Sequence, residues 1–437
     1  MPSLNIRVER WSELSEQKRT ERLMRPEQSR SLSLREAVTD ILSQVREQGD
    51  AAVIKLTQKF DNPSATQLVM SAEQKAETLK DLTATVKAAI DKAYSTITEF
   101  HRQQQPRDIR VETAPGVVCE QRYTPLQSVG LYIPGGSATL PSTALMLGVP
   151  AQLAGCPRKV LATPPTASGG IPAAVVYVAE LCGIDDIILC GGAQAIAALA
   201  YGTESVSAVD KIFGPGNAFV TEAKQQVSQD ASGVAIDMPA GPSELLVIAD
   251  ETANPAFVAS DLLSQAEHGA DSQVILLTPS EQLATQVQRQ LQQQCSELSR
   301  QETAAEALAN SRLIVTDSLN QAISLSEQYA PEHLSLQFNQ ARDYLPQLTR
   351  AGSIFVGHYT PESGGDYATG TNHVLPTYGY ARNYSSLGLL DFYRRYTVQE
   401  STAQGLAGLA DAITTLCDVE GLDAHKRAVT IRLEASS

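Results

Sequence analysis

Apolar positions along the chain follow two different repeats, which divide it into an N-terminal helical region and a longer α/β region. Residues 33–61 and 76–105 place apolar side chains at the three- and four-residue spacing of amphipathic helices. From residue 127 onward, short runs of Val, Ile and Leu alternate with helix-length segments bounded by Gly, Pro, Ser or Asn. This alternation is typical of βαβ units and predicts parallel sheets.

Two α/β blocks follow one another in this region. The first has predicted strands at 128–136, 158–165, 186–192 and 211–216, and the second at 244–250, 273–278 and 312–316, with a helix after each strand. The Gly-, Thr-, Tyr- and Pro-rich stretch 351–382 is predicted to be a loop, and loops of that length are usually functional. The helical tail 402–435 is too short to bury a core alone, so we expect it to pack on another domain or subunit.

Composition narrows the class of protein. The 437 residues correspond to about three domains at ~150 residues each. A formal net charge of −15 argues against nucleic acid and anionic membrane surfaces, because phosphate binding needs an excess of Lys and Arg. The charged N-terminus lacks a signal-peptide pattern, and no apolar run reaches the ~18 residues of a membrane span. With six scattered cysteines that read as free buried thiols, we expect a soluble cytoplasmic protein.

Glycine turns follow three of the predicted strands, at 135–136, 191–192 and 214–216. Such turns let a backbone approach a pyrophosphate at a helix N-terminus. The dinucleotide fingerprint G-x-G-x-x-G is matched only in its first half, by GPGNAF. Ordinary strand-to-helix turns explain these glycines equally well.

Two polar pairs are candidates for chemistry. Gln265 and His268 lie three residues apart on a predicted helix, where they could present two ligands to one metal or simply form a polar helix end. Glu332 and His333 follow Pro331, and a turn there would let both reach one site as a general base pair. An exposed polar corner is the alternative for this second pair.

Further candidates lie toward the C-terminus. The loop ESGGDYATGTNHVLP holds Glu362, Asp366 and His373, a composition that suits a metal or substrate site but also any polar loop. Glu420 and His425 flank the start of a short helix, where His425 taken alone is a surface histidine. The His-Glu-x-x-His, Gly-x-Ser-x-Gly and Walker signatures are absent from the sequence.

Seven long segments together resemble the histidinol dehydrogenase family in their order and spacing. They are LYIPGGSATLPSTALM, GGAQAIAALAYG, DKIFGPGNAFVTEAK, DMPAGPSE, SQAEHGADSQ, YAPEHL and GGDYATGTNHVLPT, and the resemblance runs from about residue 30 to the end. It implies a zinc-containing, NAD-dependent oxidation of L-histidinol to L-histidine through L-histidinaldehyde, the last step of histidine biosynthesis.

The resemblance also assigns site residues. The zinc ligands it implies are Gln265, His268, Asp366 and His425. Glu332 and His333 are the implied catalytic acid/base pair. The resemblance implies that Ser243, Glu420, His333 and the zinc ligands contact the substrate. It implies NAD contacts for Tyr132, Gln194 and Asn217. We hypothesise that His333 handles the alcohol and hydrate protons while Glu332 activates the water that attacks the aldehyde.

The implied fold is α/β, with two incomplete Rossmann-like domains, two small and mainly helical appendages, and an intertwined homodimer. The expected division is an N-terminal helical arm (1–24), a discontinuous first Rossmann-like domain (25–131 and 242–378), a second, NAD-binding one (132–241), a dimer-arm segment (379–402) and a C-terminal helical segment (403–437). Glu420 and His425 would then complete the site of the other subunit. A zinc hydrolase and a non-catalytic binding protein are the rival functions.

Overall fold

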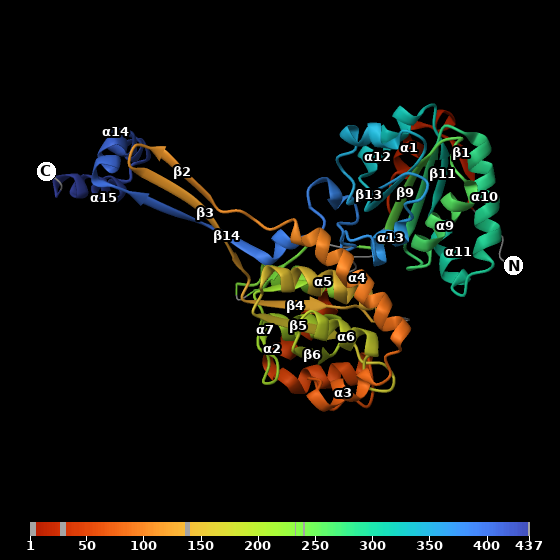
Figure 1. Cartoon of the computed structure of the whole chain (residues 1–437), viewed down its shortest axis with the longest axis horizontal. Coiled ribbons are helices and arrows are strands. Elements are labelled where there is room, and N and C mark those ends of the chain that lie inside the picture. The colour runs from red at the N-terminus through yellow and green to blue at the C-terminus, as the bar shows by residue number, and fades with distance from the viewer. Residues whose placement is uncertain (1–5, 27–31, 136–139, 232, 239–240, 436–437) are drawn as a thin grey trace.

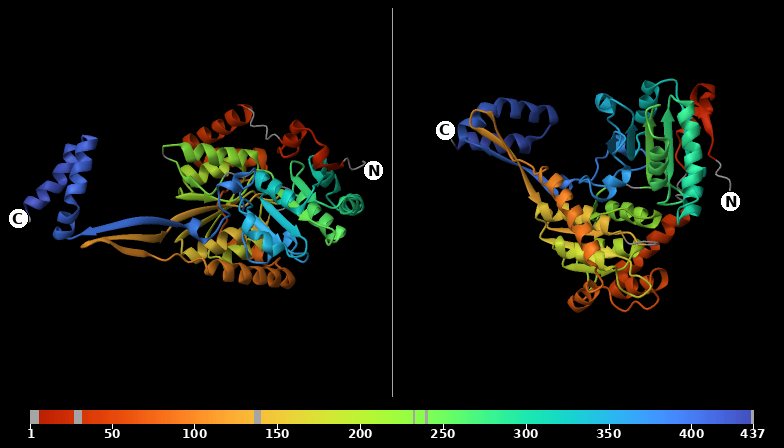
Figure 2. Two further views of the ribbon diagram at one scale, coloured as in Figure 1. Left: turned by 90° about the horizontal axis from the view of Figure 1, so that it is seen from above. Right: turned by 45° about the vertical axis from the view of Figure 1, so that its right-hand side comes forward.

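Two α/β lobes and a long projecting arm make up the chain (Figure 1). The computed structural model describes residues 6–26, 32–135, 140–231, 233–238 and 241–435. The described C-terminal end lies at the tip of the arm, and the described N-terminal end lies on the far side of the molecule. Views from two other directions show the same arm extending away from both lobes (Figure 2).

The first lobe is built on a five-stranded parallel sheet with the order β6-β5-β4-β7-β8. Its strands are β4 (Ser128–Tyr132), β5 (Arg158–Thr163), β6 (Asp186–Leu189), β7 (Lys211–Phe213) and β8 (Ala235–Ile236). This order matches the first five strands, 3-2-1-4-5, of the classic dinucleotide-binding sheet, in which the direction of winding reverses between the first and fourth strands, here β4 and β7.

Helices cover both faces of this sheet, so its strands are continuous apolar runs. One face carries α2 (Leu32–Phe60), α7 (Gly192–Tyr201) and α8 (Ala218–Gln229). The other carries α4 (Ala84–Arg102), α5 (Pro141–Ala154) and α6 (Ala173–Leu181), with α3 (Ala72–Leu79) packed on α6.

The second lobe is built on a six-stranded parallel sheet with the order β1-β11-β10-β9-β12-β13. Its strands are β1 (Val8–Arg10), β9 (Glu244–Ala249), β10 (Gln273–Thr278), β11 (Arg312–Val315), β12 (His333–Gln337) and β13 (Ser353–Val356). One face is covered by α9 (Pro255–Ala266), α10 (Glu281–Cys295) and α11 (Gln301–Ala309), and the other by α12 (Leu319–Tyr329). The short helix α1 (Glu16–Arg22) follows β1.

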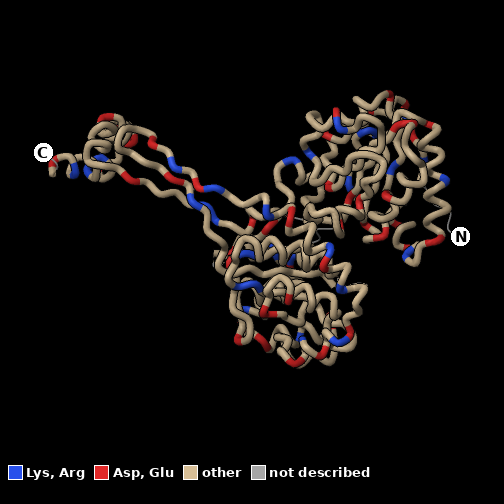
Figure 3. The backbone as a smooth tube through the Cα atoms, viewed as in Figure 1, with Lys and Arg blue, Asp and Glu red and all other residues tan. Residues whose placement is uncertain are grey.

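The arm is an antiparallel ribbon that ends in two helices. Its strands, in the order β14-β3-β2, are β2 (Ile109–Ala114), β3 (Val117–Pro125) and β14 (Tyr393–Ser401), and its helices are α14 (Ala403–Glu420) and α15 (Asp423–Glu434). Large apolar side chains are exposed on it, among them Ile109, Val111, Leu416 and Val419. Lys and Arg are interspersed with Asp and Glu along the arm and over both lobes (Figure 3).

The predicted α/β class with parallel sheets is confirmed, and all seven strands named from the sequence are present. The sequence did not reveal β1, β8, the ribbon, or the strands β12 and β13. The interval 351–382, predicted to be irregular, contains β13 and the short helix α13 (Glu362–Tyr367). β1, β8 and β13 are short and the ribbon is largely exposed, while in β12 two leucines alternate with His333, Ser335 and Gln337, so the pattern of apolar residues marks these elements weakly.

The lobes are divided differently from the predicted boundaries. Residues 25–131 were expected to accompany 242–378, but α2, α4 and β4 belong to the five-stranded lobe. Residues 1–24 were expected to be a helical arm, yet β1 pairs with β11. The segment 379–402, expected to be a dimer arm, contains two short 3-10 turns, η3 (Tyr380–Arg382) and η4 (Leu389–Phe392), followed by the ribbon strand β14. Amphipathic helices show which face is buried without showing which sheet buries it.

Two expectations about the chain's surroundings can be compared with the structure. The six cysteines are free, and five of them are buried, whereas Cys119 on β3 is partly exposed. Among the described helices, none combines the length and apolar character needed to cross a membrane.

Phe392 offers a test of how the arm is anchored. Its fully buried ring stacks on Phe213 of β7 with 4.1 Å between ring centroids. We expect Phe392→Ala to lower the free energy of unfolding by about 3–5 kcal/mol, because the cavity left behind cannot collapse fully. The measurement is denaturant unfolding. Leu390→Ala is the control, since Leu390 lies on the same 3-10 turn, η4 (Leu389–Phe392), and has 53% of its surface exposed. Equal losses in the two variants would contradict this anchoring role.

Candidate active site

A cavity of about 120 Å³ lies between the two lobes and collects most of the candidate residues. From the five-stranded lobe it is lined by the turn after β7 and the segment after β8. From the six-stranded lobe it is lined by Ser243 just before β9 and by Glu332 and His333 at the start of β12. The cavity therefore joins the carboxyl edge of one sheet to the amino edge of the other.

Glu332 and His333 reach this cavity because the chain turns sharply before β12. Helix α12 ends at Ala330, which has a left-handed backbone (φ 55°), and Pro331 follows. The two side chains then meet the same residue of β9, since the Glu244 N–H donates to Glu332 Oε2 over 2.8 Å and the Glu244 carbonyl lies 3.0 Å from His333 Nδ1. A carbonyl can only accept, so Nδ1 carries a proton, and Nε2 is the nitrogen that can gain or lose one.

Carboxylates surround His333. Its Nδ1 lies 3.5 Å from Glu332 Oε2, and its Nε2 lies 3.9 Å from both Glu362 Oε1 and Asp366 Oδ1. Burial lowers the pKa of His333, but these three carboxylates outweigh burial and raise it to about 10. Burial and the nearby Glu362 also raise the pKa of Asp366. The site thus holds excess negative charge that a cation would balance.

The described residues fit a divalent cation at this place. One atom each of His333, Glu362 and Asp366 lies within 4.8 Å of the others. The buried Gln265 also lines the cavity, and its Oε1 has no hydrogen-bond partner. His268 Nε2 lies 3.9 Å from Asp366 Oδ2. An orphaned amide oxygen beside carboxylates and imidazoles is a suitable donor set for zinc.

One detail of the predicted metal pair is wrong. Gln265 and His268 were expected to project from one helix face, but α9 ends at Ala266. Gln265 lies in the last turn, and His268 lies beyond it, with its N–H donated to the Gln265 carbonyl over 3.3 Å. The turn still directs both side chains to the same cavity, because each of them lines it.

Glu420 and His425 are not brought to this cavity within one chain. Glu420 ends α14 and His425 lies in the first turn of α15, both exposed at the tip of the arm. Figure 1 shows these helices far from the two lobes. A single chain therefore supplies Gln265, His268 and Asp366 but lacks the fourth predicted metal ligand.

Two neighbours of the predicted residues were left without a role by the sequence. His373 lies between the Asp366 carbonyl, 2.9 Å from Nδ1, and Thr143 Oγ1, 3.1 Å from Nε2. Burial lowers its pKa to about 4, so it is neutral at pH 7. The buried Glu362 accepts a 2.7 Å hydrogen bond from Ser264 at Oε2, while its Oε1 faces His333 and has no hydrogen-bond partner among the described residues. Only its place in a Gly-rich loop marked Glu362 in the sequence.

A second cavity, of about 480 Å³, contains all three predicted cofactor-binding residues. Tyr132 ends β4, Gln194 lies in the first turn of α7, and Asn217 caps α8 by accepting from the Val220 N–H over 3.1 Å. The turn 214–217 borders both cavities, since Gly214 and Pro215 line the smaller one and Asn217 lines the larger. The two cavities are therefore neighbours.

The glycine turns do not act as open phosphate cradles in this structure. The N–H groups of Gly191, Gly192 and Gly214 donate to Asp61, the Tyr132 hydroxyl and Asp237 over 3.1, 3.1 and 2.8 Å. Gly136 lies outside the described residues. The interpretation as strand-to-helix turns is sufficient for these three glycines. Asp61, which also accepts from Gln194 Nε2 over 3.1 Å, was not found from the sequence because it ends a helix far from any motif.

Comparison with known proteins places the chain. A sequence model described as histidinol dehydrogenase matches residues 23–433. The chain belongs to the histidinol dehydrogenase family. It is 67% identical over 437 residues to histidinol dehydrogenase of Idiomarina loihiensis, covering 100% of this chain and 99% of that one. It is 57% identical over 424 residues to that of Vibrio parahaemolyticus, covering 97% of each.

A solved structure agrees with this assignment. The crystal structure of histidinol dehydrogenase from Elizabethkingia anophelis superposes with a TM-score of 0.93 at 45% identity, covering 99% of this chain and 98% of that one. The resemblance seen in the sequence motifs is therefore confirmed. As a member of the histidinol dehydrogenase family, the chain is an oxidoreductase of histidine biosynthesis.

The unpartnered oxygen of Glu362 generates a first test of the site. We expect Glu362→Gln to weaken divalent-cation binding by about 10- to 100-fold, because it removes one of the carboxylates that attract the cation. Competition with a chromogenic chelator measures the affinity. Glu327→Gln is the control, since Glu327 accepts hydrogen bonds from Thr349 outside the cavity. Unchanged affinity in Glu362→Gln would remove Glu362 from the cation's surroundings.

Proposed function

We propose that this protein oxidises L-histidinol to L-histidine in two NAD-dependent steps, through L-histidinaldehyde and its hydrate. The observation that carries the proposal is that two cavities lie side by side. The smaller contains an acid/base pair and a group of side chains suited to bind a cation, and the larger has room for part of a dinucleotide. Both border the turn 214–217, so molecules bound in the two cavities would be neighbours, as hydride transfer requires. Family membership supports the same reaction.

His333 and Glu332 are the proposed proton carriers. Nδ1 of His333 donates to the Glu244 carbonyl, and Nε2 is the proposed base once a bound cation offsets the carboxylates that raise the pKa of the ring. It would take the alcohol proton, release it to solvent and then take the hydrate proton. Glu332 keeps one oxygen on the Glu244 N–H and can use the other to take a proton from the water that attacks the aldehyde. The burial of both residues keeps bulk water from competing.

Gln265, His268 and Asp366, together with His425 of a second copy, are the proposed zinc ligands. Two oxygens and two nitrogens without a thiolate form a borderline donor set that leaves room for further ligands. Bound zinc supplies orientation of the substrate's imidazole and amine rather than activation of water. Ser243, at the wall of the same cavity, and Glu420 of the second copy are the proposed remaining substrate contacts.

NAD is the proposed cofactor, held in the larger cavity by Tyr132, Gln194 and Asn217. The assembly is the proposed intertwined homodimer, because the arm exposes apolar side chains and carries the missing ligand away from its own lobes. Six unpaired thiols suit the reducing cytoplasm, which we propose as its compartment.

A coupled assay tests the reaction as a whole. We expect two NADH for each histidinol consumed, with turnover lost after chelator treatment and restored by zinc. A zinc hydrolase would give no NADH from histidinol and NAD, and a non-catalytic relative would bind zinc without turning over. Either result would contradict the proposal.

The division of labour between the two bases has its own test. Glu332→Gln should slow oxidation of supplied histidinaldehyde by about 100-fold or more, because the attacking water loses its base. Oxidation of the alcohol, which uses His333, should fall far less. Single-turnover NADH formation from each substrate measures the two steps. Equal loss in both would contradict the assignment of separate roles.

Subunit mixing tests the shared site. Since His268 and His425 would come from different chains, His268→Ala and His425→Ala should each lose zinc and activity as pure dimers. After joint unfolding and refolding, half of the dimers pair the two variants and contain one intact site, so about a quarter of wild-type activity should return. The assay is NADH formation per subunit. No recovery, with mixed dimers verified by mass, would place both histidines in a site of one chain.

A further inference from the structure

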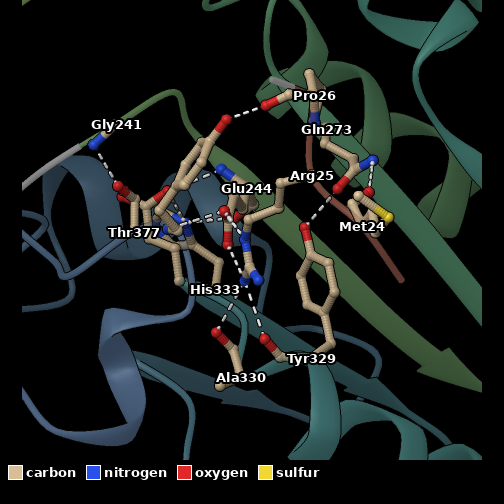
Figure 4. Close-up of polar contacts among 12 residues, drawn as sticks. Met24, Arg25, Pro26, Gly241, Glu244, Gln273, Tyr329, Ala330, His333 and Thr377 are labelled. Carbon is tan, nitrogen blue, oxygen red and sulfur yellow. Dashed lines mark hydrogen bonds and ion pairs between the residues drawn. The ribbon is translucent and has the colours of Figure 1, made fainter. Parts of the chain in front are cut away.

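We propose that Arg25 and Glu244 are positioning residues that hold Glu332 and His333 in their working arrangement. Arg25 and Glu244 lie next to His333, with Arg25 on the N-terminal segment and Glu244 at the start of β9 (Figure 4). The inference rests on the proposed acid/base roles of Glu332 and His333, and it assigns a task to two residues that contact neither substrate nor cofactor in that proposal.

The main chain of Glu244 is the common support of both bases. Its N–H donates to Glu332 over 2.8 Å, and its carbonyl accepts from His333 Nδ1 over 3.0 Å. A small rotation of this one peptide segment would therefore displace the carboxylate and the imidazole together. It would also release the hydrogen bond that keeps the proton on Nδ1 and leaves Nε2 basic.

The Glu244 side chain prevents that rotation, because it is held on two sides. Arg25 binds both of its oxygens, one through Nε and the other through a terminal nitrogen over 2.8 Å. The Tyr378 N–H donates to Glu244 Oε1 over 2.9 Å, and the Tyr378 hydroxyl donates to the Pro26 carbonyl. Only 2% of the Glu244 side chain and 11% of the Arg25 side chain are exposed.

The same guanidinium also holds the turn that leads into β12. The terminal nitrogen of Arg25 that binds Glu244 has one further N–H, which is shared between the carbonyls of Tyr329 and Ala330 at 3.0 and 3.1 Å, and the guanidinium stacks on the Tyr329 ring, 3.9 Å from its centroid. Ala330 has the left-handed backbone that precedes Glu332. One side chain thus fixes the starts of both β9 and β12, the two strands on which the acid/base pair depends.

Such a contact requires an arginine. A planar guanidinium can bind a carboxylate through two nitrogens and still donate to two carbonyls, whereas a lysine ammonium offers three donors at a single point. The pair is also expensive to bury, and a stabilising role alone could be filled by apolar side chains of similar size. Its geometry is explained by the need to fix the Glu244 peptide.

The test compares two arginine–glutamate pairs of the same N-terminal segment. Arg25→Met/Glu244→Gln removes the pair without leaving a buried unpaired charge. The matched control is Arg22→Met/Glu9→Gln, because Arg22 binds both oxygens of Glu9 in the same way, over 2.6 and 2.8 Å, away from the site. Arg25→Lys, which keeps the charge, is the conservative variant. Each full-length dimer is assayed for kcat, the KM for histidinol, zinc content and thermal unfolding.

We expect the Arg25/Glu244 variant to lose about 10- to 100-fold in kcat, since displacement of a base by about 1 Å has an effect of that size. Its KM and zinc content should stay within about two-fold of wild type, because the proposed metal ligands come from α9, the turn after it, α13 and α15 of the second copy, none of which Arg25 or Glu244 holds. Arg25→Lys should recover part of the loss, and the control should match wild type.

Two outcomes would overturn the inference. One is a kcat equal to that of the Arg22/Glu9 control. The other is a parallel loss of kcat, zinc and thermal stability with a rise in KM, which would show a structural role only. If the double variant does not fold, the kcat of Arg25→Lys decides, with a wild-type value counting against the inference. Absence of NADH formation by the wild-type protein would instead refute the proposed function itself.

Discussion

The uncompensated charge of three buried carboxylates around one imidazole is the constraint on which the site depends. Glu332, Glu362 and Asp366 lie within 3.5–3.9 Å of the His333 ring nitrogens, and the space holds too little positive charge to balance them. Buried charges of one sign are tolerated only when a proton or another counter-charge joins them, and the raised pKa values of Asp366 and His333 reflect this demand. A divalent cation and a cationic substrate are such counter-charges, so the same feature explains the metal cluster and the preference for an amino alcohol that we propose.

The position of the site departs from the usual rule for parallel sheets. Ligands of open α/β sheets normally bind outside the carboxyl ends of the strands. The larger cavity obeys this rule in the five-stranded lobe, whereas Ser243, Glu332 and His333 lie at the amino ends of β9 and β12 in the other lobe. This arrangement lets two similar lobes face each other, with one offering its cofactor edge and the other offering main-chain groups that orient the acid/base pair.

The sequence alone predicts the central strands of both lobes and the helices that follow them, because their apolar runs are buried on both faces. It also identifies Gln265, His268, Glu332, His333 and Asp366 as candidates, and the structure brings these five to one cavity. The roles of Asp61, Arg25 and Glu244 could not be found this way, since each acts through contacts distant in sequence and follows no local motif. The sequence also could not predict which lobe the first helices belong to, because the apolar face of an amphipathic helix does not show which sheet it packs against.

The location of the bound metal tests the account most directly. Crystals of the protein with zinc and histidinol, with anomalous scattering recorded at the zinc edge, would locate the ion independently of any assumed ligands. We predict one zinc per site, coordinated by Gln265, His268 and Asp366 of one chain and by His425 of a second copy, with His333 Nε2 left free beside the substrate. A zinc bound instead between His333, Glu362 and Asp366 of a single chain would contradict the account.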